Sequence, residues 1–169
     1  LEVEVKEFAD GQTLRGGGVT VTAVKVNHDP FPEVYGFAVE HEGYRFVHSA
    51  DTIVWKPLIE AARGADCLLH EVFIKREMRP LDGVRTQEGI DAVAAYHTLS
   101  TEVGAVAAEA DVGMLILTHF VPTTFDRTAL VAEVRAQWHG PLILGEDLME
   151  YDLATRTLQA GSATVSFPR

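Results

Sequence analysis

The segment Arg45–Thr52, RFVHSADT, ends an alternating stretch with a small-residue turn and a carboxylate. Arg45–His48 alternate in polarity, as the residues of a half-buried β-strand do. Ser49 and Ala50 then form a turn that delivers Asp51. Taken alone, Asp51 is typical of a polar turn or a helix cap. The alternative is a metal ligand presented at the end of a strand, and the flanking sequence has to distinguish the two.

Length and composition predict one globular domain. The chain has 169 residues, of which 47% are hydrophobic and 23% charged, and this is enough for a buried core. The formal net charge of −11 at pH 7 argues against a broadly basic surface for nucleic acid, although it leaves room for a local basic patch. Cys67 is the single cysteine and lies in an apolar run, so we expect a buried thiol.

The sequence carries no signal for a membrane or for export. No apolar run reaches the ~18–20 residues that span a bilayer, and no signal peptide is visible. We therefore expect a cytoplasmic protein without a membrane partner. Because the sequence opens on Leu1 and not on methionine, we expect the true N-terminus to lie upstream.

Hydrophobic periodicity on both sides of Arg45–Thr52 predicts a sheet covered by helices. Apolar strands alternate with helices in the second half of the chain, and in such sheets function collects in the loops at strand ends. Strands are expected at residues 1–8, 19–26, 35–41, 44–49, 66–73, 112–120 and 141–145, with a closing β-segment at 148–167. Helices are expected at 52–64, closed by Gly64, at 100–110, capped by Ser100 or Thr101, and at 127–138, between Asp126 and Gly140; residues 11–18 and 78–89 are expected to be loops.

Side chains of the types that bind metals recur where these strands end. Each one alone is more often a cap, a turn residue or a solvated side chain, but their recurrence favours a shared site. Histidine and carboxylate together suit zinc or a similar divalent ion, and a carboxylate can bridge two ions. The residues are His28, Asp51, the pair His70-Glu71 and His119 at strand ends, and His97 just before a helix.

The same stretches resemble the metallo-β-lactamase superfamily, in particular its ribonuclease Z-like and arylsulfatase-like hydrolases. The resemblance covers most of residues 19–149 in several ordered motifs. They are VNHDPFPEVYGFAVEHEGYRFVHSADT at 26–52, GADCLLHEVF at 64–73, YHTLSTEVGAVAAEADVGMLILTHFVP at 96–122 and PLILGEDLM at 141–149.

This resemblance implies a role for each of five residues. His28, Asp51 and His119 match metal ligands of the family, and Asp51 matches the aspartate that bridges two ions. His97 matches a catalytic histidine, and Glu71 matches its acidic partner; in ribonuclease-like members this pair handles protons for the leaving group. We therefore predict His97, Glu71 and Asp51 as catalytic residues and His28, Asp51 and His119 as metal ligands.

The sequence departs from the family at one of these motifs. The family usually presents its aspartate as Ser-Gly-Asp-Thr, and Ala50 stands here in place of the glycine, a change that is tolerated where the backbone needs no positive φ. His70 is interpreted as a structural residue that supports the site. His41, His48 and His139 match no family position and are interpreted as ordinary surface or strand residues.

The resemblance also implies the fold, a four-layer αββα sandwich of mixed α/β (α+β) class made of two halves. The His-x-His-x-Asp-His run that supplies further ligands in the family is absent from residues 1–169. We therefore expect one metallo-β-lactamase-like domain, residues 1–169, that carries the second half of the sandwich and its junction strands, with the N-terminal portion missing. Half a sandwich leaves an apolar sheet face uncovered, which predicts association.

The leading hypothesis for function is a hydrolase with two Zn²⁺, or another divalent metal such as Mn²⁺, in the complete protein. A metal-bound hydroxide would attack a small sulfate, phosphate or related ester, so a small-molecule ester is the expected partner. One alternative is a tRNA 3′-end processing endonuclease, but THFVPTTFDR at 118–127 lacks the Ser-x-Arg-Tyr motif of tRNA-processing members, so nucleic acid is not favoured. Another is a non-catalytic binding protein that retains the fold. The family also implies a homodimer.

Overall fold

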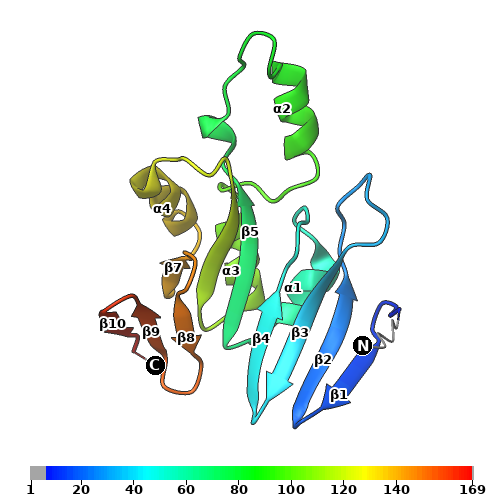
Figure 1. Cartoon of the computed structure of the whole chain (residues 1–169), viewed down its shortest axis with the longest axis vertical. Helices are drawn as coiled ribbons and strands as arrows, with labels where there is room; N and C mark the ends of the chain where they lie inside the picture. Colours follow the sequence, from blue (N-terminus) through cyan, green and yellow to red (C-terminus); the bar gives the residue numbers. More distant parts are fainter. Residues whose placement is uncertain (1–6, 169) are drawn as a thin grey trace, which may run out of the picture.

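A seven-stranded sheet dominates the structure, a computed structural model that describes residues 7–168 (Figure 1). The strands lie side by side in sequence order, from β1 to β7. Neighbours from β1 to β4 are antiparallel, and neighbours from β4 to β7 are parallel. Their bounds are Thr13–Gly16 (β1), Val19–Lys25 (β2), Tyr35–His41 (β3), Tyr44–His48 (β4), Cys67–Phe73 (β5), Leu115–Val121 (β6) and Leu142–Leu144 (β7).

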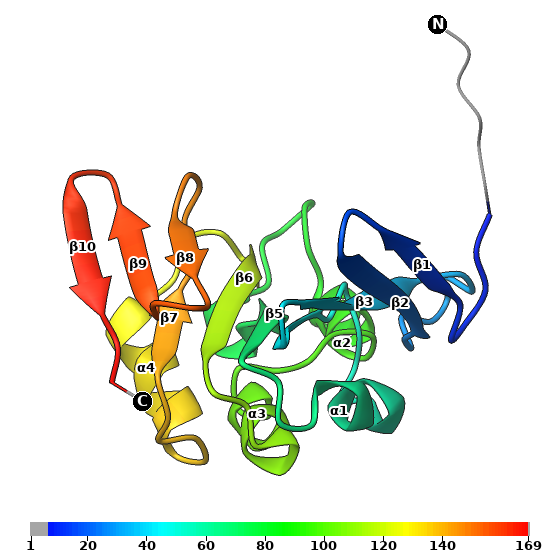
Figure 2. The ribbon, with the colours of Figure 1, turned by 90° about the horizontal axis from the view of Figure 1, so that it is seen from below.

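Three helices cover one face of this sheet (Figure 2). They are α1 (Lys56–Ala62), α3 (Val103–Ala110) and α4 (Arg127–Arg135), which follow β4, the segment after β5, and β6. The core beneath them is apolar, and fully buried leucines such as Leu58 of α1, Leu117 of β6 and Leu130 of α4 each contribute about 1.5–3 kcal/mol by burial. No helix within residues 7–168 combines the length and the apolar character that crossing a lipid bilayer requires.

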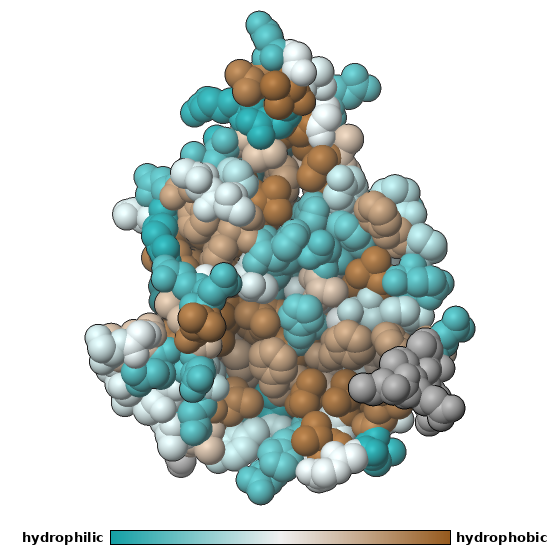
Figure 3. Space-filling view, in the orientation of Figure 1, coloured by the Kyte–Doolittle hydropathy of each residue, from teal (hydrophilic) through white to brown (hydrophobic). Residues whose placement is uncertain are grey.

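Within residues 7–168 the opposite face of the sheet carries no helix, and we call it the helix-free face. Because side chains alternate along a strand, Phe46, Leu69 and Ile116 point to this side and stay partly exposed. Figure 3 shows hydrophobic, brown surface over the strands on this face. A second sheet of β8 (Glu150–Asp152), β9 (Thr157–Ala160) and β10 (Ala163–Ser166) lies at the β7 end and encloses with it a cavity of about 580 Å³. The described residues thus form one helix layer on one main sheet, in agreement with the predicted mixed α/β class.

A segment between β5 and α3 projects beyond the strand ends (Figure 1). It holds a 3₁₀ turn, η1 (Lys75–Glu77), and the helix α2 (Gln87–Ala94). The helix begins at Thr86, whose hydroxyl accepts a hydrogen bond of 3.0 Å from the Gly89 N–H. The prediction of a loop over residues 78–89 is therefore wrong at its end, because the polar Thr86 caps a helix.

The first hairpin also differs from the prediction. The Gly-rich turn predicted over residues 11–18 is shorter than expected, because Thr13–Gly16 pair with Val19–Thr22. Gly17 and Gly18, with φ of +58° and +80°, make the tight turn that allows this pairing. The strand predicted at residues 1–8 falls largely on residues 1–6, which lie outside the described residues, and residues 7 and 8 form no strand.

The positions of α1, α3 and α4 along the chain agree with the prediction, but their first and last residues differ from it. Asp126 caps α4 as predicted, through a bond of 3.0 Å from the Ala129 N–H, but α4 ends at Arg135, well before Gly140. The N-cap of α3 is Glu102, without a side-chain capping bond, and not Ser100 or Thr101. The helix predicted over 52–64 begins only at Lys56, because Pro57 fits the first turn of a helix and not its interior.

Candidate metal centre

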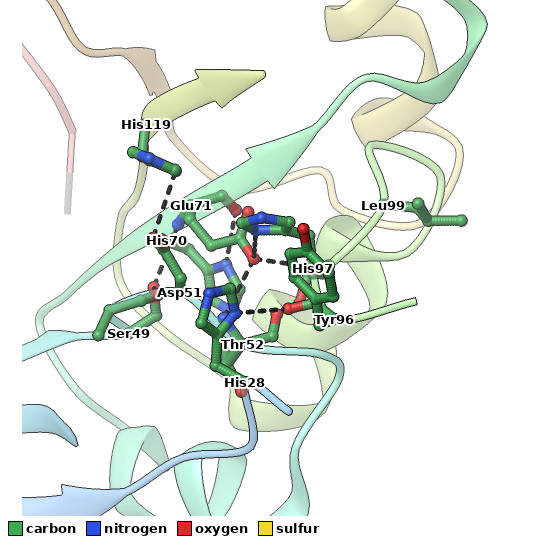
Figure 4. A network of polar contacts seen from close by, with 12 residues as sticks. His28, Ser49, Asp51, Thr52, His70, Glu71, Tyr96, His97, Leu99 and His119 are labelled. Atoms are coloured by element: carbon green, nitrogen blue, oxygen red, sulfur yellow. Dashed lines mark hydrogen bonds and ion pairs between the residues drawn. The ribbon is translucent and has the colours of Figure 1, made fainter. Parts of the chain in front are cut away.

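Four strand ends meet at one edge of the sheet. β2 and β4 flank the antiparallel β3, and β4, β5 and β6 are parallel, so β2, β4, β5 and β6 all run in the same direction. Their carboxyl ends bring together residues that are far apart in the sequence, and the side chains point toward one another (Figure 4). The set is His28 after β2, Asp51 after β4, Glu71 in β5, His119 in β6 and His97 from the segment before α3.

Small residues let the backbone approach closely just before Asp51. A Cβ atom added to Gly36 of β3 would lie 2.5 Å from the carbonyl oxygen of His48, so only glycine fits there. Ser49 is fully buried, and its Oγ accepts a hydrogen bond of 3.1 Å from the N–H of Glu71. These contacts tie the end of β4 to both neighbouring strands and hold the Asp51 turn in place.

Two residues at the site adopt a left-handed backbone. Ala50 has φ of +53°. Alanine was expected to be tolerated here only where the backbone needs no positive φ, so the substitution for the family's glycine carries backbone strain. His119 has φ of +44° and is the extra residue of a β-bulge, because the pairing of β5 with β6 skips it. The bulge turns the His119 imidazole toward Asp51, with 3.2 Å between Nδ1 and Oδ1.

Glu71 is the hub of a buried polar network. Its side chain is 1% exposed, and Oε1 accepts hydrogen bonds from the N–H of Thr52 (3.2 Å), the N–H of Thr98 (2.9 Å) and Nδ1 of His97 (3.1 Å). The Thr98 hydroxyl donates to the carbonyl of Thr52 at 2.7 Å. The network therefore couples the Asp51 turn to the loop that carries His97.

Hydrogen bonding fixes which nitrogen of each buried histidine is free. Nδ1 of His28 lies 2.8 Å from the carbonyl oxygen of Tyr96, which can only accept, so the proton is on Nδ1. Nδ1 of His97 donates in the same way to the Glu71 carboxylate. In both residues Nε2 keeps its lone pair for a metal ion or a proton, and partners of this kind commonly orient metal-bound histidines.

The predicted site residues come together in two overlapping groups, and neither group is the predicted ligand set of His28, Asp51 and His119. Ligand atoms of His28, Asp51 and His97 lie within 4.8 Å of one another, and so do those of Glu71, His97 and His119. His119 joins Asp51 through the contact of 3.2 Å, so the structure gathers all five predicted residues, with His97 shared by both groups. The nitrogen and carboxylate donors, the free Nε2 atoms and this spacing fit a divalent ion of the zinc type.

The remaining histidines divide by position. His48 is the last residue of β4, as a strand histidine is expected to be, and it also lines the same cavity as Asp51. Burial lowers its pKa, and the Asp51 carboxylate opposes that shift. His70 is fully buried, burial lowers its pKa, and its Nδ1 donates to the backbone carbonyl of the next residue, which fits the structural role predicted for it. His41 and His139 are exposed and do not line this cavity.

Several residues of the site were not predicted from the sequence. Thr52 and Thr98 carry the network around Glu71, Tyr96 orients His28, and Ser49 bonds Glu71. The available signal is their proximity to predicted ligands in the segments SADT and YHTLS. Phe31, on the loop after β2, also lines the cavity, and a lone aromatic in a Pro-rich loop gave no such signal.

Comparison with known proteins decides the family. The model of the Beta-lactamase superfamily domain matches residues 1–120, which is well over half of the 169 residues. The chain belongs to the metallo-β-lactamase superfamily. The matched residues include His28, Asp51, Glu71, His97 and His119, so the whole candidate centre lies within the superfamily domain.

Relatives and solved structures of the superfamily resemble this chain over about half of their own length. Ribonuclease Z of Mycolicibacterium paratuberculosis is 35% identical over 154 residues, which are 86% of this chain and 51% of that protein. The metallo-beta-lactamase fold protein YhfI from Bacillus subtilis superposes with a TM-score of 0.64 at 25% identity, over 82% of this chain and 52% of the other. Zn²⁺-bound PqqB from Methylobacterium extorquens shares the fold, with a TM-score of 0.54 at 22% identity over 83% and 51%. The predicted ribonuclease Z-like branch of the superfamily is thereby confirmed.

Proposed function

We propose that the complete protein is a metal-dependent hydrolase of phosphodiesters and that this chain supplies one half of its active site. The observation that carries the proposal is the buried pair His97–Glu71 beside the ligand atoms of His28 and Asp51. A proton-handling pair next to a metal centre can protonate the leaving oxygen while the metal stabilises the developing charge, and both effects accelerate hydrolysis of an ester. The similarity to ribonuclease Z supports a phosphodiester as the bond that is cleaved.

Each residue has a distinct task in this proposal. Two divalent ions, Zn²⁺ or Mn²⁺, held by His28, Asp51 and His119 would supply Lewis-acid stabilisation of the phosphoryl oxygens and a nucleophile. Asp51 lies between histidines on both sides and fits a bridging carboxylate. In its imidazolium form, which the Glu71 carboxylate stabilises by accepting the Nδ1–H, His97 gives a proton from Nε2 to the leaving oxygen.

The other half of the site would come from chain beyond residues 1–169. The chain spans about half the length of the curated relatives it matches, and its helix-free face carries partly exposed apolar side chains. A second sheet layer packed on that face would bury these side chains and bring further metal ligands. The proposal therefore keeps the interpretation of residues 1–169 as the second half of one domain, and a homodimer is the other arrangement that would cover the face.

A small sulfate or phosphate ester is the second candidate substrate, and two observations favour it. Within residues 7–168, no lysine or arginine lines the cavity that holds Asp51 and His119, a cavity of about 770 Å³. A protein that grips RNA usually contacts several phosphates with basic side chains. The net charge of −11 also suits a small substrate better than tRNA.

Hydrolysis by the complete protein, loaded with Zn²⁺ or Mn²⁺, tests the proposal. Bis(p-nitrophenyl) phosphate, p-nitrophenyl sulfate and a tRNA with an unprocessed 3′ end are offered in parallel, and we expect cleavage of the phosphodiester. Asp51→Ala should remove both metal and activity, whereas Asp82→Ala, an exposed carboxylate of the projecting segment, should change neither. Cleavage of the sulfate alone, or of no substrate, contradicts the proposal, and salt-sensitive binding of tRNA would identify RNA as the substrate.

A further inference from the structure

The loop between β2 and β3 carries an exposed aromatic ring at the edge of the metal centre. Its base is closed by a hydrogen bond of 3.0 Å from the Val26 N–H to the Val34 carbonyl and by the ion pair Lys25–Glu33 at 3.1 Å. At its tip, the N–H of Phe31 donates to the carbonyl of His28 at 2.8 Å. The backbone of Phe31 is therefore held against a predicted metal ligand.

The Phe31 side chain is placed for contact with a ligand and not for packing in the core. It is 55% exposed, among the largest apolar exposures in the described chain, although a phenyl ring gains free energy when it leaves water. One face of the ring stacks on the His28 imidazole, with centroids 5.2 Å apart and an interplanar angle of 17°. The ring lines the same cavity as Asp51 and His119.

We propose that Phe31 is a stacking platform for a planar ring of the substrate, a nucleobase or an aryl group, attached to the phosphodiester that is cleaved at the metal centre. This inference rests on the proposed function and specifies its substrate class. Pro32 and Val34 extend the apolar wall beside Phe31, and within residues 7–168 no lysine or arginine lines the cavity. Glu33 also lines it, but its carboxylate is bonded to Lys25 and Tyr35. The contact that this wall offers to a substrate is therefore mainly apolar and aromatic.

Phosphodiesters that share one leaving group test this selection. Methyl p-nitrophenyl phosphate has no second ring, phenyl p-nitrophenyl phosphate carries an aryl ring next to the phosphorus, and thymidine 5′-(p-nitrophenyl phosphate) carries a base beyond a sugar. In the complete, metal-loaded protein, Phe31→Ala should lower kcat/KM about 5- to 150-fold on a ring-bearing substrate, mainly through KM, and leave the methyl ester within about twofold. Phe31→Tyr, which keeps an aromatic ring, should retain the preference for the ring-bearing ester over the methyl ester. Which ring-bearing ester is affected distinguishes an aryl group from a nucleobase.

A matched control and a binding measurement separate this inference from the proposed function. Leu14→Ala removes an apolar side chain that is 50% exposed on β1 and lines neither cavity at the site. This variant should leave kcat/KM unchanged for all three esters. If Phe31→Ala slows the methyl ester as much as the others, or loses metal, then Phe31 only supports His28 and the inference is wrong. If the wild type cleaves none of the three esters, the proposed function fails. The inference is then tested by binding alone, with thymidine 5′-phosphate as the ring-bearing ligand and methyl phosphate as the ligand without a ring. If wild type and Phe31→Ala bind thymidine 5′-phosphate with equal affinity, the inference is wrong.

Discussion

Local backbone strain and the candidate chemistry coincide at the residue scale in the turn before Asp51. Ala50 has φ of +53°, a conformation that costs an L-residue about 1–2 kcal/mol and that glycine adopts freely. The sequence shows the alanine but not its dihedral angle, so the strain could not be predicted. Strained residues of this kind persist where the surrounding structure holds them, and here Ser49 and Glu71 do so.

Replacement of Ala50 by glycine should stabilise the protein. We expect Ala50→Gly to raise the free energy of unfolding in urea by about 0.5–1 kcal/mol, because relief of the left-handed strain exceeds the extra backbone entropy of glycine in the unfolded chain. Ala105→Gly is the matched control: it makes the same change at an exposed position inside α3 and should cost about 1 kcal/mol. Equal losses in both variants would show that φ at position 50 carries no strain.

The role of the Glu71 charge can be tested with Glu71→Gln, a substitution that keeps the size and shape of the side chain. In Glu71→Gln the neutral amide no longer stabilises a protonated His97, so we expect kcat of the complete protein to fall by about 10²- to 10⁴-fold while the metal content stays the same. Glu109→Gln changes an exposed carboxylate of α3 and should leave kcat unchanged. Normal turnover in Glu71→Gln would remove the His97–Glu71 pair from the mechanism.

At the scale of elements, the strands and their ends were predictable because each strand has a clear period and ends at a chemically distinct residue. Apolar runs mark β5 and β6, alternation marks β2 to β4, and four of the five site residues lie at or near the ends of these strands. The bulge at His119 was not predictable, because it depends on the pairing of β6 with β5 and not on the sequence of β6. The same holds for β1, whose pairing depends on the dihedral angles of Gly17 and Gly18.

Gly36 tests how closely β3 must approach the Asp51 turn. A Cβ at position 36 would meet the His48 carbonyl oxygen at 2.5 Å and the Ser49 carbonyl oxygen at 2.9 Å, and backbone atoms cannot move aside without disturbing the turn. We expect Gly36→Ala to lower the free energy of unfolding by about 1–3 kcal/mol and to weaken metal binding. Gly16→Ala on β1, where a Cβ has no neighbour within 4 Å, is the control and should be nearly neutral. A neutral Gly36→Ala would refute the close approach.

On the scale of the whole molecule, the layers explain why one face of the sheet is buried and the other stays partly exposed. Helices α1, α3 and α4 bury one face of the sheet, and the helix-free face keeps Phe46, Leu69 and Ile116 partly exposed. The sequence predicted this arrangement only through the family resemblance, since periodicity alone does not say what covers a sheet. The chain spans about half the length of the curated relatives it matches, and the half-sandwich stays a prediction.

The pH dependence of stability provides a measure of burial in this sheet. Burial raises the pKa of the Cys67 thiol to about 12, from an ordinary value of 9.0. Above pH 9 the thiol ionises in the unfolded chain but not in the folded one, so stability is present below pH 9 and is lost progressively up to about pH 12. We expect the free energy of unfolding to fall more steeply between pH 9 and 10.5 in the wild type than in Cys67→Ala. Parallel curves would show that the thiol is not buried in the folded state.

Metal content is the measurement that tests the central claim most directly. The complete protein, dialysed against metal-free buffer and examined by elemental analysis, should retain about two divalent ions per chain, as a site with a bridging carboxylate does. Asp51→Ala should lose them, because its carboxylate lies between His28, His97 and His119. Wild-type protein without bound metal, or an Asp51→Ala variant that binds as much metal as the wild type, would contradict the account and leave the cluster of strand-end histidines without a catalytic role.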